Sequence, residues 1–339
     1  MGRKNITIKD VAKEAGVSVS AVSKAFNEYG DISDTTRRHI LEVSKRMNYQ
    51  PNIVAKSLSS LKNYRIGMLI QDYKEEENDG VDAFTLKLTM EFQNEVSKMN
   101  YETVLLTTTS DAQKIKSISN LIEEKQIDGL FIIGLKTTDE YFKQLKEINY
   151  PIVLWDIEIN NPSVCCVGVN NTKGSFLAVE YLIKQGHKRI GFINGHKEAF
   201  VSYERLNGYF LALNRYNLPV DNNLIVHSDF TYKGGAGAVE SLIKENRDIT
   251  AVFCASDLMA IGIINELQRE GYSVPQDISV IGFDDIDFAR YINPMLTTIR
   301  QDKGLVGRIA ANTLINMING QNTGRIMIEP ELIIRESVN

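Results

Sequence analysis

The stretch TIKDVAKEAGVSVSAVSK, residues 7–24, decides the fold of the N-terminal part of the chain. Thr7 and Asp10 have the spacing of a capping box, in which two side chains satisfy backbone N–H groups at a helix start. Apolar residues then recur at helical spacing from Ile8 to Ala15, and Gly16 supplies a left-handed stop. These signals predict a first helix over about residues 8–15.

Two further short helices are predicted directly after the first one. Ser18 can cap a helix from Val19 to about Asn27, and Ser33 can cap a third helix that carries Ile40 inward. The turn between the first two helices is too short to let them separate. This arrangement predicts a helix-turn-helix, a motif whose second helix enters the major groove of DNA.

The candidate DNA contacts lie on the second helix and at the helix starts. Small polar side chains can reach base edges, and a lysine can donate to guanine. The expected base contacts are Ser18, Val19, Ser20, Ser23, Lys24 and Asn27. The expected phosphate contacts are Thr7, Ser33, Thr36 and Tyr49. A serine-rich helix is by itself more often a polar surface, but the capping box, the tight turn and the basic charge coincide here.

Charge is distributed unevenly along the chain. Residues 1–63 hold 11 Lys and Arg against 6 Asp and Glu, a net charge of +5, whereas the remainder holds 27 against 37, a net charge of −10. A basic head on an acidic body suggests that one end meets a polyanion. On charge alone, a solvated surface explains the head equally well.

The stretch after the head, residues 50–63, is predicted to be a hinge helix and linker. It has Asn52 as a possible cap, and Ala55 and Leu58 lie three residues apart on one helical face. Paired helices from two subunits could press these residues into a minor groove, with the leucine between base steps. A flexible tether that happens to contain one leucine is the alternative.

Composition excludes several classes of protein. At 339 residues the chain suits about two domains and a small third one, and it lacks both a signal-peptide pattern and an apolar run of ~20 residues. Its three cysteines, two of them adjacent, offer neither a disulfide framework nor a zinc site, which favours a reducing cytoplasm. No HExxH, GxSxG or P-loop pattern occurs. We therefore expect no metal, no cofactor, no membrane association and no enzyme activity.

From Tyr64 onward, β-rich runs alternate with helical patterns, which predicts parallel sheets covered by helices. Eight strands fall into two groups of four around residues 160–163, at 65–70, 102–107, 129–133 and 152–155, then 164–169, 189–193, 251–254 and 280–283. The expected fold is an all-α helix-turn-helix head followed by an α/β core of two doubly wound parallel-sheet lobes. A ligand is expected between the lobes at the carboxyl ends of the strands.

The head and the hinge carry a family resemblance. Residues 8–24, with YQPN at 49–52 and AKSL at 55–58, resemble the DNA-binding head and hinge of the lactose-repressor (LacI/GalR) family of bacterial transcription regulators. The resemblance continues over nearly the whole chain, through QGHKRIGF (185–192), RLNGY (205–209), ASDLMAIG (255–262), VIGFDD (280–285) and PMLTTIRQ (294–301). Lys24 departs from the usual arginine; it keeps a positive donor and loses the bidentate fork.

The resemblance implies a domain division and an effector site. It implies a DNA-binding domain at 1–49, the hinge at 50–63, and a periplasmic-binding-protein-like core at 64–339. The N-lobe would comprise about 64–161 and 294–322, and the C-lobe about 162–293 and 323–339. The implied effector contacts are Arg205, Ser256, Asp257 and Asp284, with Phe84, Asp156 and Phe230 at further such positions.

The chemistry of these residues agrees with a polyhydroxyl ligand. Carboxylates and an arginine fork can bond to hydroxyl groups, and an aromatic face can pack on the apolar face of a sugar ring. Taken singly, Asp284 suits a turn or cap and Arg205 suits a structural ion pair. Together at strand ends they favour a binding site. The acidic loop at 71–84 and Asn170 depart from the usual family residues at these places.

The function implied is a cytoplasmic transcription regulator, expected to be a repressor, that binds operator DNA under the control of a sugar or sugar derivative. The chain ends without a leucine-heptad tail, which implies a homodimer. One alternative is a regulator whose main co-effector is a phosphorylated carrier protein on the N-terminal lobe. Another is a sugar-binding protein without DNA function. An enzyme would need a nucleophile–base pair or phosphate loop that the sequence does not offer.

Overall fold

The computed structural model describes residues 6–26, 32–49, 62–71, 81–321 and 324–339, with side chains described from Thr85 onward in the helix that starts at Val81. The chain divides into two compact units, Met1–Tyr64 and Arg65–Asn339, and each is taken by itself below. Across the described ranges, no helix is both long enough and apolar enough to cross a membrane.

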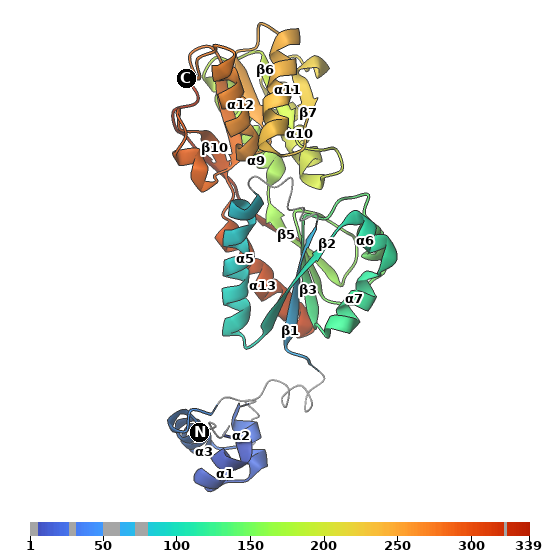
Figure 1. Ribbon diagram of the computed structural model, residues 1–339, viewed down its shortest axis with the longest axis vertical. Coiled ribbons are helices and arrows are strands. Elements are labelled where there is room, and N and C mark those ends of the chain that lie inside the picture. Colours follow the sequence, from blue (N-terminus) through green and yellow to red (C-terminus); the bar gives the residue numbers. More distant parts are fainter. Residues whose placement is uncertain (1–5, 27–31, 50–61, 72–80, 322–323) are drawn as a thin grey trace. The chain divides into compact units, whose positions relative to one another are not determined.

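The first unit contains the three predicted helices, α1 (Ile8–Glu14), α2 (Val19–Phe26) and α3 (Asp34–Arg46) (Figure 1). Their apolar faces meet in a small core in which Val11, Val22 and Ile40 are fully buried. Tyr49 packs against this core, and its ring meets the Phe26 ring edge to face with the two ring centroids 5.8 Å apart. The helix-turn-helix prediction is confirmed.

Local hydrogen bonds start each helix as the sequence predicted. The backbone N–H of Thr7 donates to Asp10 Oδ2 at 2.8 Å, which is one half of the capping box. The Oγ of Ser18 accepts from the N–H of Ala21 at 3.1 Å. The Oγ of Ser33 accepts from the N–H of Thr36, also at 3.1 Å. Each cap satisfies a backbone donor that would otherwise lack a partner.

The second unit contains two lobes, each built on a six-stranded sheet. In the first lobe the strand order is β11-β5-β4-β3-β1-β2, and every pair is parallel. In the second lobe the order is β12-β10-β9-β8-β6-β7, with β12 antiparallel to β10. The first-lobe strands are β1 (Arg65–Gln71), β2 (Glu102–Thr108), β3 (Gly129–Ile133), β4 (Ile152–Trp155), β5 (Val164–Val169) and β11 (Ile326–Ile328). The second-lobe strands are β6 (Ile190–Asn194), β7 (Ile225–His227), β8 (Ala251–Cys254), β9 (Ser279–Asp284), β10 (Thr297–Arg300) and β12 (Glu331–Ile333).

Helices cover both faces of each sheet (Figure 1). In the first lobe, Phe131 stacks on Phe92 from one face of β3, while Leu130 and Ile132 pack into the cluster on the other face. The first-lobe helices are α5 (Val81–Lys98), α6 (Ser110–Ile115), α7 (Ile118–Lys125), α8 (Glu140–Gln144) and α13 (Lys303–Ile318). The second-lobe helices are α9 (Asn171–Lys184), α10 (Phe200–Arg215), α11 (Tyr232–Glu245), α12 (Asp257–Arg269) and the short 3₁₀ turns η1 (Asn222–Leu224) and η2 (Asp287–Arg290).

The predicted lobe boundaries are wrong in three places. Strand β5 was expected to open the second sheet, but it pairs with β4, so that Cys166 faces Leu154 across the first sheet. The segment at 294–322 was expected in the N-lobe without a strand, but its residues Thr297–Arg300 form β10, which pairs with β9 of the second lobe. Strand β11 lies in the first lobe rather than the second. Strand pairing depends on contacts between distant segments, which a reading of local pattern does not contain.

The corrected topology places the crossings between the lobes. Within the described residues, the chain passes from one lobe to the other at Asn170, at 301–302 and at 329–330. The first and last of these segments lie side by side, because β5 pairs with β11 and the N–H of Asn170 donates to the carbonyl of Ile328 at 3.0 Å. The lobes are therefore joined by short connecting segments, an arrangement that permits hinge motion.

Candidate functional site

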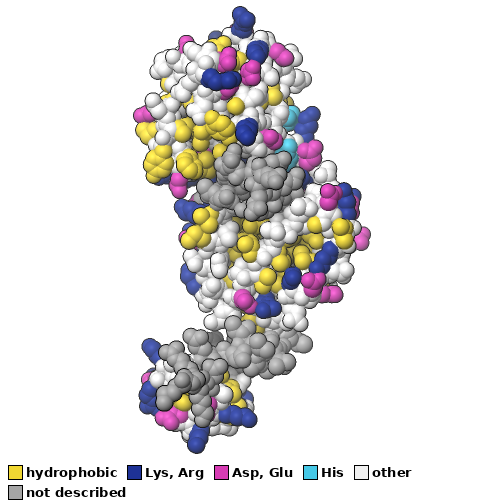
Figure 2. Space-filling model, in the orientation of Figure 1, with side chains coloured by type: hydrophobic (Ala, Val, Ile, Leu, Met, Phe, Trp, Pro, Cys, Tyr) yellow, Lys and Arg dark blue, Asp and Glu magenta, His cyan; other side chains and the backbone are white. Residues whose placement is uncertain are grey.

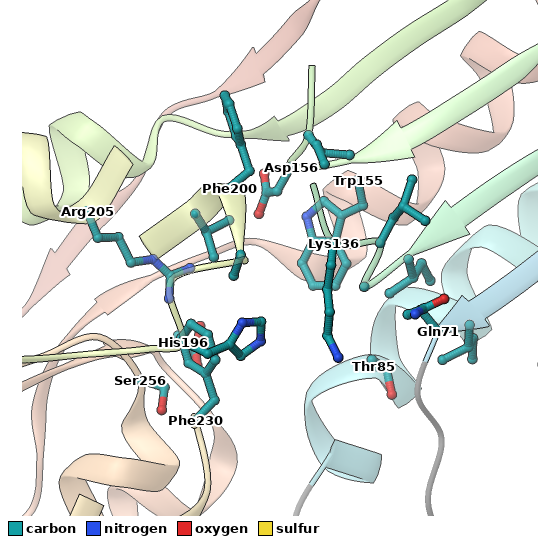
Figure 3. A pocket seen from close by; sticks show the side chains of 18 of the residues that line it. Gln71, Thr85, Lys136, Trp155, Asp156, His196, Phe200, Arg205, Phe230 and Ser256 are labelled. Atoms are coloured by element: carbon teal, nitrogen blue, oxygen red, sulfur yellow. The ribbon is translucent and has the colours of Figure 1, made fainter. Parts of the chain in front are cut away.

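A cavity of about 300 Å³ lies between the two lobes at the carboxyl ends of their strands. The first lobe contributes residues at the ends of β1, β3 and β4, and the second lobe contributes residues after β6, β7 and β8, at the end of β9, and from α10. Figure 3 shows the polar and aromatic side chains that face this space. Parallel sheets place loops and side chains together at this edge, which is the usual ligand site of such folds.

Arg205 enters the cavity from α10 and is held firmly in place. Its Nε donates to Oδ1 of Asn171 at 2.9 Å, and its Nη1 donates to the carbonyl of Ala255. The guanidinium carbon lies 4.0 Å from the centre of the Phe283 ring. Burial lowers the pKa of Arg205, and the carboxylates of Asp284 and Asp156 oppose that change. An arginine keeps its charge under these conditions, so the cavity holds a fixed fork of donors.

Two buried acids flank this arginine. The Oδ1 of Asp156 accepts from the N–H of Val169 at 2.8 Å, and burial raises the pKa of Asp156 to about 7. The Oδ1 of Asp284 accepts from the side-chain amide of Gln301 at 2.6 Å, and burial also raises the pKa of Asp284. A carboxyl group that is protonated near neutral pH can donate as well as accept, which suits the hydroxyl groups of a polyol.

Three of the site residues have a left-handed backbone. Asp156, Phe230 and Asp284 have φ angles of 55°, 67° and 130°. Such angles are rare for residues other than glycine, and for a bulky residue such as Phe230 they cost free energy. Strained residues of this kind occur preferentially where a side chain must be aimed at a ligand.

Aromatic side chains form another part of the cavity wall. The Phe230 ring meets the His196 ring edge to face, with centroids 5.4 Å apart. Gly195 makes room for this ring, because a Cβ at that position would lie 1.9 Å from Phe230 Cζ. Trp155 and Phe200 also line the cavity. Flat apolar surfaces next to hydrogen-bonding groups are typical of sites for ring-shaped polar ligands.

Most of the predicted effector contacts meet in this cavity. Asp156, Arg205, Phe230, Ser256 and Asp284 all line it, and Ser256 also caps α12 through the N–H of Met259 at 3.3 Å. The side chain of Phe84 lies outside the described part of the structure, although its neighbour Thr85 is among the lining residues.

Asp257 is not among the residues that line the cavity. It is fully buried, and its carboxylate accepts from the backbone N–H of Ile286 at 2.9 Å and from the hydroxyl of Thr298. Burial and the neighbouring Asp284 raise the pKa of Asp257 to about 7. Its geometry is that of a support, because it fixes the segment that follows Asp284.

The cavity also contains residues that no sequence motif indicated. Gln71 ends β1, Lys136 follows β3, and His196 follows β6. The rule that ligands bind at strand ends could have found all three, since the preceding strands were predicted. Next to them, both the N–H and the hydroxyl of Thr137 donate to the carbonyl of Glu198 at 3.2 Å, a contact between the lobes.

In the head, the predicted base contacts Ser18, Val19 and Ser20 are exposed at the start of α2. Ser23 and Lys24 are half-buried on the same helix. The predicted phosphate contacts Thr7 and Ser33 are exposed, while Thr36 and Tyr49 are half-buried. Asn27, Asn52, Ala55 and Leu58 lie outside the described residues.

Side chains of the metal-ligating types are spread out in the part of the chain that the structure describes. There, no group of three or more His, Cys, Asp or Glu side chains is placed to hold a metal ion. Cys165, Cys166 and Cys254 are buried and form no disulfide, and burial raises the pKa of Cys166 to about 12.

Comparison with known proteins gives matches over both units. The model of bacterial regulatory proteins of the lacI family matches residues 7–52, and that of the periplasmic binding protein-like domain matches residues 179–338. The ribose operon repressor of Haemophilus influenzae is 33% identical over 98% of this chain and 98% of its own length.

Two solved structures cover almost the entire chain. A lac repressor dimer bound to operator and the anti-inducer ONPF is 26% identical, with a TM-score of 0.76 over 98% of this chain and 99% of that one. A complex of the transcriptional regulator CelR with cellobiose is 28% identical, with a TM-score of 0.74 over the same shares of both chains.

Proposed function

Because the chain belongs to the lacI family of bacterial regulatory proteins, we propose that it is a homodimeric repressor whose operator affinity is set by a small molecule held between the lobes. The family resemblance of the sequence is confirmed, and the relatives above are named as repressors or transcriptional regulators, none as an enzyme. A regulator of bacterial transcription works in the cytoplasm, where the DNA is.

The cavity is the observation that carries the proposal. An arginine fork, two acids whose pKa values are raised by burial, a serine hydroxyl and aromatic rings converge there from both lobes. This set matches a sugar or sugar derivative, and about 300 Å³ lies at the small end of ligand cavities. The names of the relatives agree, since one regulates a ribose operon and another was solved with cellobiose.

DNA binding is assigned to the head. We expect α2 to enter the major groove, with the exposed Ser18, Val19 and Ser20 and the partly covered Lys24 directed at base edges. The net charge of +5 over residues 1–63 supports attraction to the phosphate backbone. The hinge roles of Asn52, Ala55 and Leu58 rest on the sequence.

The dimer surface is assigned to apolar side chains that remain exposed in the second unit. On the second lobe these are Phe288, Tyr291, Met295 and Ile334, with Tyr291 81% exposed. On α5 of the first lobe they are Leu86 and Met90. Figure 2 shows apolar side chains gathered over the second lobe around η2 and β10. Exposed apolar patches mark interaction sites, and the solved lac repressor is a dimer.

A ligand panel with a DNA readout tests the proposal. A compound that binds the folded chain raises its stability by RT ln(1 + [L]/Kd), about 2.7 kcal/mol at 100 times the Kd. We expect one sugar or sugar derivative to raise the unfolding temperature and to change affinity for a duplex selected by the full chain. A panel without any hit, together with operator affinity that responds only to a phosphorylated carrier protein, would favour the carrier-protein regulator. Binding of a sugar by a chain that shows no salt-sensitive DNA binding would favour the alternative of a sugar-binding protein without DNA function.

A further inference from the structure

A line of polar contacts leads from the cavity to the boundary between the lobes. Arg205 donates from Nε to Oδ1 of Asn171 at 2.9 Å. Asn171 is fully buried, and its Nδ2 donates to Oε2 of Glu204 at 3.2 Å. Glu204 precedes Arg205 on α10, yet its side chain turns away from the cavity toward the first lobe. The side-chain amide of Asn171 therefore bonds both to Arg205, which lines the cavity, and to Glu204, which lies at the boundary of the lobes.

Glu204 completes the line by pairing with an arginine of the other lobe. Its Oε1 lies 3.1 Å from Nη2 of Arg325, which directly precedes β11 of the first sheet. Arg325 also pairs through Nη1 with Glu158, which follows β4 of the same lobe, at 2.9 Å. The Glu204 side chain is only 13% exposed, so water and salt screen this pair less than a surface pair. A change in lobe arrangement would alter this pair directly.

A second ion pair crosses the same boundary without reaching the cavity. Lys173 of α9 pairs with Glu329, which lies between β11 and β12. Their side chains are 51% and 61% exposed, and exposed pairs contribute little to stability. This pair offers a matched control, because it links the same lobes but lies outside the line of bonds from Arg205 to Arg325.

We propose that Glu204 is a positioning residue that couples the state of Arg205 in the cavity to the arrangement of the two lobes. The inference rests on the proposed function in one respect, namely that the effector contacts Arg205. Among the described residues, Asn171 and Ala255 take two of the five N–H donors of Arg205, and a ligand can take others. A ligand that fixes the guanidinium also fixes Asn171 and Glu204, and thereby favours the lobe arrangement in which Glu204 meets Arg325.

The coupling can be measured without DNA and without a known effector. Cysteines introduced at the exposed positions Asn120 of α7 and Ser241 of α11 would carry one spin label on each lobe, since the three native cysteines are buried. Dilution with unlabelled chain keeps one labelled protomer in each dimer. Pulsed electron resonance then gives the distribution of distances between the lobes in the ligand-free protein.

Three backgrounds separate the proposal from its alternatives. We expect Arg205→Lys, which removes the Nε contact with Asn171, to change the ratio of lobe arrangements about fivefold in the otherwise native chain. In the Glu204→Gln background, Arg205→Lys should change the ratio of lobe arrangements less than twofold, because the carboxylate that links Asn171 to Arg325 is already gone. In the Glu329→Gln background the change should keep its full size. Arg325→Gln perturbs the same line of contacts from the first lobe, at a side chain that is 39% exposed. It should change the ratio of lobe arrangements in the native chain, and this change should also fall below twofold in the Glu204→Gln background.

The contrary results are as clear. Equal effects of Arg205→Lys in the native and Glu204→Gln backgrounds would overturn the proposal, as would an Arg325→Gln variant that leaves the distances unchanged. Equal loss of coupling with Glu329→Gln would reduce Glu204 to an ordinary boundary contact. Thermal unfolding of each variant shows whether it is folded. If Arg205→Lys does not fold, the distances between the lobes in Arg325→Gln still test the proposal. Failure here would leave the ligand and DNA tests of the proposed function untouched.

Discussion

Replacement of Asp156 by asparagine should stabilise the core more at high pH than at low pH. Asp156 is 8% exposed, and its Oδ1 accepts from the N–H of Val169. Asparagine has nearly the same shape and keeps that acceptor. Burial raises the pKa of Asp156 from 3.8 to about 7 in the folded chain, despite the opposing attraction of Arg205. The variant has no proton to release from this position.

The size of the effect follows from the pKa change. Between about pH 4 and pH 7 the unfolded chain has lost this proton while the folded chain keeps it, so stability is full below about pH 4 and is lost toward pH 7. About two of these pH units lie above pH 5, and over each of them the native chain loses ~1.4 kcal/mol of unfolding free energy that the variant keeps. Between pH 5 and pH 8 the variant should therefore gain about 3 kcal/mol in unfolding free energy relative to the native chain. At about 2 °C for each kcal/mol, the unfolding temperature of the variant should gain about 6 °C relative to the native chain.

The assay is thermal unfolding of both chains from pH 5 to pH 8. The difference between them isolates Asp156 from other titrating groups such as Asp257. Asp302→Asn, which removes the same formal charge from the exposed cap of α13 and can keep the bond to the N–H of Leu305, serves as the control. A difference that stays constant with pH would show that Asp156 is already ionised in the folded chain, and the reasoning would fail.

Three further substitutions probe the head, the hinge and the cavity. Lys24→Ala should weaken operator binding by about 1–3 kcal/mol and reduce the salt slope by about one, as measured by titration at several salt concentrations; an unchanged slope would remove Lys24 from the interface. Leu58→Ala should weaken operator binding about tenfold with sugar binding intact, whereas loss of both would argue against a dedicated hinge. Asp284→Asn should weaken binding of the sugar found in the panel by about 1.5–3 kcal/mol in calorimetry, and an unaltered Kd would contradict its place in the site.

The head was predictable because its signals are local. The bonds from Thr7 to Asp10 and from Thr36 to Ser33 span three residues, so their spacing in the sequence already contains their geometry. The left-handed backbone of Gly16 likewise depends on one residue, with φ at 65°. Helix bounds therefore agree with prediction to within a residue or two.

The lobe division was less predictable because it depends on pairing between distant segments. The pattern of Val164–Val169 predicts a buried strand, and the strand exists, but nothing in it names β4 as its partner. Strand β11, a three-residue strand after the last long helix, was not among the predicted strands at all. Strand existence is local, whereas strand order is decided by the whole fold.

The cavity falls between these two cases. Resemblance to the family predicted Arg205 and Asp284, and both line the cavity: Asp284 at the end of β9, but Arg205 from within α10 rather than from the strand end that the sequence suggested. Asp257 follows Ser256 in the motif ASDLMAIG, but as the first residue of α12 it turns inward to Thr298. Gln71 and Lys136 escaped notice because the segments after β1 and β3 carry no motif. Side-chain direction at a helix start is set by packing, which the sequence alone does not show.

The most direct test of the account compares DNA binding by the full chain with binding by residues 64–339 alone. A duplex selected with the full chain is titrated with each protein by fluorescence anisotropy at 50 and 200 mM salt. The account predicts tight and strongly salt-dependent binding by the full chain, and none above background by the core, although the core keeps the sugar-induced rise in unfolding temperature. Equal affinity of the two proteins for the duplex would contradict the central claim that the head reads the DNA.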